Sequence, residues 1–198
     1  MVSPPARDRF DTARLINIAN GLTAARVLLV PYFAFLLISG RGKAALLVFA
    51  VCGLTDALDG LLARWLKQRT LVGTLLDPIA DKLLMATAFI VLSYVHIVPL
   101  RLAVIVISRD IFILVGSLLY LLVLDASDIQ ATSLSKANTG VQVLTVIYFL
   151  AVAAFPVETK TLGTGTLPSG IVTWVCAATT VASGLQYMYI GLRKLSDA

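Results

Sequence analysis

Six apolar runs follow one another along the chain, each close to the roughly twenty residues that a helix needs to cross a bilayer. Short breaks with glycine, proline, serine or charge separate them, as expected where apolar helices end. The predicted spans are Leu22–Ile38, Ala44–Leu66, Leu75–Val98, Leu102–Leu124, Lys136–Phe155 and Leu167–Ile190. With 59% hydrophobic and only 14% charged residues, the chain is too apolar for a soluble domain. We therefore predict an all-α integral membrane protein, a single six-helix domain at 21–198 after a juxtamembrane segment at 1–20.

The distribution of positive charge predicts which helix ends face the cytoplasm. Six spans place both termini on one side, which carries nine lysines and arginines against four on the other. Because cytoplasmic loops are enriched in these residues, the termini and the loop after Leu66 are expected in the cytoplasm.

The N-terminus, with Asp8 and Asp11, is too polar for a signal peptide. We expect a bacterial inner-membrane protein, with the matrix side of the mitochondrial inner membrane as the alternative. The basic residues are scattered between spans, which argues against nucleic-acid binding.

Four aspartates interrupt the second and third spans, where each carboxylate costs about 2.5–3.5 kcal/mol. Helical spacing places them on one stripe of each span, near the cytoplasmic end. The first stripe comprises Asp56, Asp59, Gly60, Ala63 and Arg64, and the second comprises Gly73, Asp77 and Asp81. The spans are joined by a short turn, so we expect them to lie antiparallel with the two stripes facing. Such a cluster needs cations, and carboxylate ligation suits two Mg²⁺ or Mn²⁺ ions.

Two features separate this cluster from other uses of membrane carboxylates. Gly60 and Gly73 are unfavourable in a helix by about 1 kcal/mol relative to alanine, and their missing side chains leave room for a ligand. A cation transporter or channel is the alternative class, but transport sites typically lie near the membrane midplane on broken helices. The acids here cluster at one end of a hairpin, which favours an enzyme.

The residues from Asp56 to Asp81 resemble the signature of the CDP-alcohol phosphotransferases. That pattern reads here as Asp56-x-x-Asp59-Gly60-x-x-Ala63-Arg64, then eight residues, then Gly73-x-x-x-Asp77-x-x-x-Asp81. The resemblance implies that an acceptor hydroxyl attacks the phosphorus of a CDP-linked lipid and that CMP leaves. It also implies the following roles: Asp56, Asp59 and Asp77 as metal ligands, Asp81 as general base at the metals, and Gly60, Ala63, Arg64 and Gly73 at the CDP-lipid pocket. For Ala63 helix packing is an equal alternative, and Arg64 could instead extend to the interface. The family resemblance further implies a homodimer.

The first span resembles the same family at its entry. The stretch "NIANGLTAARVLLVP" is similar to the corresponding stretch of phosphatidylglycerophosphate and cardiolipin synthases. This similarity implies that Asn20, Thr23 and Arg26 approach the nucleotide side of the site. An arginine followed by "VLLVP" is otherwise costly in lipid.

Two further polar groups bear on the acceptor. Arg109 and Asp110 lie within the fourth span, and Lys136 opens the fifth. Neighbouring residues on a helix do not face each other, so we expect that Arg109 and Asp110 do not simply neutralise one another. Arg109 and Lys136 are interpreted as an anion site for the acceptor's phosphate. An interhelical Arg–Asp pair that holds the bundle together is the alternative.

The start of the fifth span predicts which acceptor is used. Phosphatidylglycerophosphate synthases tend to have Gly-Lys-x-Lys-Thr-x-x-Gln there, whereas this chain has Ser135-Lys136-Ala137-Asn138-Thr139-Gly140-Val141-Gln142. With Asn138 in place of the second lysine, the stretch looks closer to the eukaryotic-type cardiolipin synthases. The loss of one cation suits phosphatidylglycerol, a phosphodiester of one charge, better than glycerol 3-phosphate, which carries nearly two. The resemblance thus implies cardiolipin formation from CDP-diacylglycerol and phosphatidylglycerol, with phosphatidylglycerophosphate synthesis as the alternative.

Overall fold

The computed structural model is all-α, with six helices and no strand among the residues that it describes. These are residues 18–66, 71–124, 132–155 and 167–196, with side chains described at 25–55, 82–116, 132–155, 168–191 and 193. The helices are α1 (Ile18–Ile38), α2 (Gly42–Leu66), α3 (Leu71–Tyr94), α4 (Leu100–Leu124), α5 (Ser133–Ala154) and α6 (Leu167–Ser196). Each predicted span corresponds to one helix, so the all-α prediction is confirmed.

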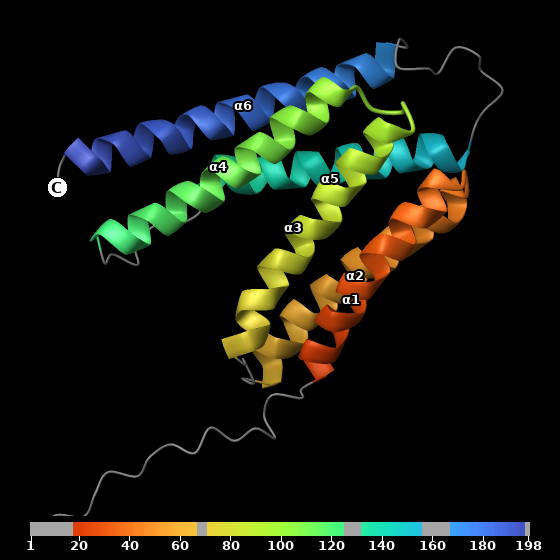
Figure 1. The fold of residues 1–198 in the computed structure, drawn as a ribbon, viewed down its shortest axis with the longest axis horizontal. Coiled ribbons are helices and arrows are strands. Elements are labelled where there is room, and N and C mark those ends of the chain that lie inside the picture. The colour runs from red at the N-terminus through yellow and green to blue at the C-terminus, as the bar shows by residue number, and fades with distance from the viewer. Residues whose placement is uncertain (1–17, 67–70, 125–131, 156–166, 197–198) are drawn as a thin grey trace, which may run out of the picture.

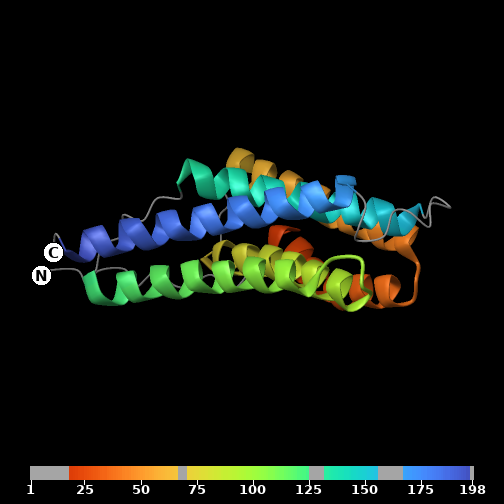
Figure 2. The same cartoon turned by 90° about the horizontal axis from the view of Figure 1, so that it is seen from above.

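The helices alternate in direction and diverge toward one end of the molecule (Figure 1). α1 packs against α2 and α3, while α4 packs against α3 and α6. α5 contacts α2, α3 and α6, and so connects the two groups. Figure 2 shows the same arrangement from above, with α3 and α4 lying below α5 and α6. The start of α1, the end of α2 and the start of α3 therefore lie together at one end of the bundle (Figure 1).

α1 and α3 end in the same kind of turn. The second residue after each helix has a positive φ angle, 71° at Gly40 and 60° at His96. In both turns the next amide N–H donates to a helix carbonyl five residues earlier, at 2.9 Å after Gly40 and 3.0 Å after His96. This hydrogen-bond pattern closes a helix and normally uses glycine at the left-handed position. It ends α3 at Tyr94, before the predicted end at Val98.

Aromatic side chains from four helices form the centre of the core. Phe33 of α1, Phe49 of α2, Phe89 of α3 and Phe149 of α5 are all buried. The rings of Phe33 and Phe49 pack with their centroids 5.9 Å apart. Such tilted aromatic pairs add to the stabilisation that burial of apolar area provides. The core thus holds α1, α2, α3 and α5 together at the end of the bundle away from the aspartate motif.

Gly42 lets the start of α2 lie directly against the end of α5. A Cβ atom at Gly42 would overlap the carbonyl group of Ala153 and lie 2.8 Å from the backbone nitrogen of Ala154. Replacing Gly42 with alanine is therefore expected to destabilise the protein by about 1–3 kcal/mol, since backbone must move. Gly53 is the control, because it lies on the same helix and a Cβ atom there would have no neighbouring atom within 4 Å. Its alanine variant should be as stable as the unmodified protein or up to about 1 kcal/mol more stable. Thermal denaturation in detergent compares the two, and equal midpoints would contradict the close packing.

Candidate functional site

The four predicted metal-binding aspartates lie on two helices, Asp56 and Asp59 on α2 and Asp77 and Asp81 on α3. Their side chains lie outside the described ones, so the facing of the two stripes stays a prediction. Six residues predicted for the CDP-lipid pocket also have side chains outside the described ones, so their roles stay predictions: Asn20, Thr23, Gly60, Ala63, Arg64 and Gly73. Among the side chains that are described, no group of three or more histidines, cysteines or acids could hold a metal ion.

Arg26 is the predicted pocket residue whose side chain is described. It is only 2% exposed, on α1. It acts electrostatically on Cys52 of α2, which lies one helical turn before Asp56. Cys52 precedes Asp56 by four residues, a spacing that places two residues on the same face of a helix. A buried guanidinium requires polar or anionic surroundings, which agrees with the prediction that Arg26 approaches the nucleotide side of the site.

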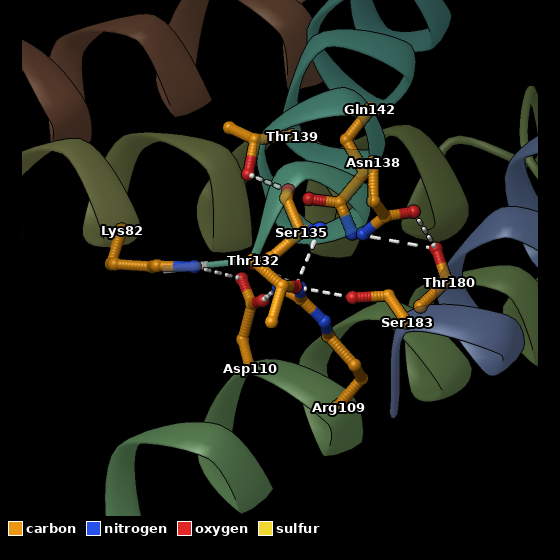
Figure 3. Close-up of polar contacts among 10 residues, drawn as sticks. All are labelled: Lys82, Arg109, Asp110, Thr132, Ser135, Asn138, Thr139, Gln142, Thr180 and Ser183. Atoms are coloured by element: carbon orange, nitrogen blue, oxygen red, sulfur yellow. Dashed lines mark hydrogen bonds and ion pairs between the residues drawn. The ribbon is translucent and has the colours of Figure 1, made fainter. Parts of the chain in front are cut away.

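Arg109 is the centre of a buried polar cluster between α4, α5 and α6 (Figure 3). The residue as a whole is 7% exposed. One terminal nitrogen donates to Asp110 Oδ1 at 2.8 Å, and the other donates to Ser135 Oγ at 2.7 Å and to Ser183 Oγ at 2.6 Å. The expectation that Arg109 and Asp110 do not neutralise one another was therefore wrong. The arginine side chain is long enough to turn back to its neighbour's carboxylate, although their Cβ atoms point in different directions.

The carboxylate of Asp110 also binds a residue of the aspartate helix. Lys82 Nζ lies 2.9 Å from Asp110 Oδ2, and Lys82 directly follows Asp81 on α3. Figure 3 shows Lys82 and Arg109 approaching the same carboxylate from opposite sides. The ion pairs thus connect the helix that carries two predicted metal ligands with α4, and through Arg109 with α5 and α6. Two cations and one carboxylate leave this cluster with one net positive charge.

The first turn of α5 is fixed beside the cluster by a helix cap. Thr132 Oγ1 accepts a hydrogen bond from the backbone N–H of Ser135 at 3.2 Å, which satisfies a donor at the open start of the helix. The same hydroxyl donates to Gln186 Oε1 of α6 at 3.0 Å. This places Ser135 within reach of Arg109. Lys136, the other predicted acceptor-binding residue, has an exposed side chain, and the contacts of Arg109 are with Ser135 instead.

A second polar layer lies deeper between α5 and α6. Asn138 is fully buried, and its Oδ1 accepts from Thr180 Oγ1 at 3.1 Å, while Gln142 Nε2 donates to the same hydroxyl at 3.4 Å. Two buried donors of these layers, Asn138 Nδ2 and Arg109 Nε, have no hydrogen-bond partner in the described part of the chain. Buried donors are rarely left unpaired, because each costs free energy without an acceptor. The oxygen atoms of a ligand, or of water, would provide hydrogen-bond acceptors for these two N–H groups.

Three residues of these layers were missed by the sequence analysis: Lys82, Thr180 and Ser183. The sequence did contain a signal for Lys82, since a lysine within an apolar helix requires an acidic partner. Asp110 was available as that partner, because no role at the site had been given to it. For Thr180 and Ser183 the signal was a polar stripe along α6, continued by the buried Ser169 and Thr173 at helical spacing.

Residues 16–182 match the CDP-alcohol phosphatidyltransferase family, most of the chain, and the protein therefore belongs to this family. It is similar to the CMP-forming cardiolipin synthase of Rattus norvegicus, 32% identical over 90% of this chain and 63% of the relative. It is also 32% identical to a probable phosphatidylglycerophosphate synthase of Mycobacterium tuberculosis, over 92% of this chain and 85% of the relative. A Bacillus subtilis relative, CDP-diacylglycerol–glycerol-3-phosphate 3-phosphatidyltransferase, is 30% identical over 87% of this chain and 94% of its own length. The chain thus spans less than two thirds of the rat relative, and the relatives include both acceptor types.

Proposed function

We propose that the protein is a membrane enzyme that transfers a phosphatidyl group from CDP-diacylglycerol to phosphatidylglycerol, forming cardiolipin and CMP. Family membership and the complete aspartate motif support the transfer. The choice of acceptor depends on one observation: the buried cluster around Arg109 carries a single net positive charge beside two unpaired donors. A phosphodiester supplies one negative charge and several acceptor oxygens, which fits both properties.

All six helices are proposed to span the membrane. α5 and the Pro168–Gly191 part of α6 are long and apolar enough to cross a bilayer, and shorter apolar helical segments occur at Ala25–Ile38, Gly42–Thr55 and Lys82–Tyr94. Large apolar side chains point outward along the bundle, among them Leu28 at 74% and Leu47 at 64% exposed. Lipid rather than water suits such a surface. The positive charge distribution supports a location of the aspartate motif at the cytoplasmic face of a bacterial inner membrane, or at the equivalent matrix face in mitochondria. By analogy with its family, the protein is proposed to form a homodimer.

Asp56, Asp59, Asp77 and Asp81 would hold two divalent ions, Mg²⁺ or Mn²⁺, as suits a set of oxygen donors. When bound, such ions supply charge stabilisation to the oxygens of the pyrophosphate during in-line displacement. Asp81 would take the proton of the acceptor hydroxyl, whose oxygen bonds to the phosphatidyl phosphorus as the bond to CMP breaks. Arg26, buried on α1, is proposed to contact the nucleotide with Asn20 and Thr23. The other CDP-lipid contacts are proposed to be Gly60, Ala63, Arg64 and Gly73.

Arg109 is proposed to bind the phosphate of the acceptor, with Lys136 at the exposed entrance. The free Nε of Arg109 and Nδ2 of Asn138 would both donate to phosphate oxygens. The ion pair between Lys82 and Asp110 would hold this acceptor site at a fixed position relative to Asp81, because Lys82 is its neighbour. Phosphatidylglycerophosphate synthesis is the second candidate, favoured by the nearly full-length match to the Bacillus subtilis relative.

The acceptor is tested with purified protein, CDP-diacylglycerol and either phosphatidylglycerol or glycerol 3-phosphate. We expect phosphatidylglycerol to release CMP at least about tenfold faster, with cardiolipin as the product. An Asn138→Lys variant adds a second cation to the site and should shift the ratio of the two rates toward glycerol 3-phosphate by about tenfold, or 1.4 kcal/mol. Asn138→Leu, similar in size but uncharged, is the matched control and should leave that ratio unchanged. Faster release with glycerol 3-phosphate by the unmodified protein would exclude cardiolipin synthesis while leaving the transfer chemistry intact.

A further inference from the structure

A pocket of about 860 Å³ opens at the end of the molecule away from the aspartate motif. It lies between the turn that joins α3 to α4 and the first turns of α6, which adjoin in Figure 1. The buried side chains of Ser93 and Thr173 form part of its inner surface, while Arg101 and Trp174 line it from exposed positions. Its volume is within the range of small-molecule sites, about 300–1,000 Å³. No residue proposed for the transfer reaction lines it.

The pocket is cationic where it is exposed and apolar along its helical walls. The Arg101 guanidinium lies 5.8 Å from the centroid of the Trp174 ring, a cation–π contact that orients it. Arg101 has no carboxylate partner in the part of the chain that the structure describes. Ile90, Val104 and Ile107 supply apolar surface from α3 and α4. A ligand that fits this combination has an anionic group attached to a hydrocarbon chain.

His96 also lines the pocket, and it does so with a left-handed backbone. The equivalent turn after α1 has glycine at this position, where glycine avoids the steric cost that a side chain pays. A histidine in this conformation costs about 1–3 kcal/mol, a cost that tends to be kept at binding sites. The imidazole adds an N–H donor to the residues that line the pocket.

We propose that this pocket binds one phospholipid of the surrounding bilayer, with its phosphate against Arg101 and His96 and an acyl chain along α3, α4 and α6. Charge complementarity determines the choice of ligand, since a guanidinium with no carboxylate partner among the described residues favours an anion and the apolar walls favour hydrocarbon. The site rests on the membrane placement proposed above but not on the identity of the acceptor. It would hold a lipid of the leaflet opposite the reaction, which binds without being consumed.

Native mass spectrometry of the full chain in detergent tests this, with dioleoylphosphatidylmethanol as the added lipid. This lipid is an anionic phosphodiester with no hydroxyl group that could act as acceptor. Arg101→Gln should weaken the tightest lipid adduct about tenfold, the effect of losing one charge-assisted hydrogen bond. The matched control is Arg41→Gln, an exposed arginine on the turn between α1 and α2 at the same end of the bundle. It should bind as the unmodified protein does.

His96→Gly provides a second readout that a purely structural role would not give. We expect the variant to unfold at a higher temperature, because the turn is relieved, while binding the lipid several-fold more weakly. Equal lipid affinity for Arg101→Gln and Arg41→Gln would overturn the proposal, as would a His96→Gly variant that gains stability without losing affinity. Loss of a protein dimer, rather than of a lipid adduct, on Arg101 substitution would instead identify a second copy of the chain as the occupant. CMP release is measured in parallel, so failure here is separate from failure of the proposed reaction.

Discussion

Replacing Asp77 with asparagine is expected to lower the rate of CMP release by about a thousandfold or more. An amide keeps the size of the carboxylate but removes the negative charge that holds a divalent ion, and with it the charge stabilisation of the displacement. Asp77 is the third aspartate of the motif and lies on α3, one helical turn before Asp81. The measurement is CMP release from CDP-diacylglycerol by purified protein over a range of Mg²⁺ and Mn²⁺ concentrations.

The same variant separates lost metal binding from lost folding. A carboxylate within a membrane helix costs about 2.5–3.5 kcal/mol, so the asparagine variant should be at least as stable as the unmodified protein when no metal is present. Added Mn²⁺ should raise the denaturation temperature of the unmodified protein and leave that of Asp77→Asn nearly unchanged. Glu158→Gln removes an acid outside the motif and serves as the control, with activity and metal response retained. Activity of Asp77→Asn near that of the unmodified protein would refute the metal site.

The helices could be predicted from the sequence because each is an apolar run closed by residues that end helices. Their ends were less predictable where a turn uses an unusual residue. Glycine at Gly40 marks the end of α1, but His96 takes the same left-handed conformation without any local signal, and α3 ends earlier than predicted. The contacts of α1 with both α2 and α3 were not predicted either. A short turn indicates that the two helices it joins lie near each other in space. It does not determine which third helix packs against them.

The polar cluster shows a second limit, which concerns side-chain length. Helical spacing predicts the direction of the Cβ atom, and on that basis Arg109 and Asp110 should not meet. An arginine has several rotatable bonds beyond that atom, and in the structure it reaches its neighbour and two serines from other helices. These serine partners, one on α5 and one on α6, are short and uncharged, and the signal for Ser183 was only the polar stripe along α6. The sequence singles out the charged groups in apolar helices, whereas the partners of Arg109 required the tertiary fold.

Replacing Arg109 with methionine is expected to destabilise the protein by about 3–5 kcal/mol, the range for removal of one member of a buried ion pair. The variant leaves Ser135 and Ser183 without their donor and Asp110 with Lys82 alone. For a chain of this size the midpoint of thermal denaturation should fall by roughly 6–20 °C. Lys82→Met is the matched control, because it removes the more exposed partner of the same carboxylate, 43% exposed against 6% for Arg109. Its effect on stability should stay below about 1 kcal/mol.

Arg109→Lys distinguishes a structural role from acceptor binding if the methionine variant does not fold. Lysine keeps the charge but lacks the planar fork that reaches Asp110 and the two serines together. Because Arg109 is proposed to bind the acceptor's phosphate, this variant should raise the KM for phosphatidylglycerol about tenfold or more and leave the KM for CDP-diacylglycerol within about twofold. A structural defect would instead lower kcat and change both KM values together. Equal KM values for the acceptor in Arg109→Lys and the unmodified enzyme would show that the cluster only holds the helices together.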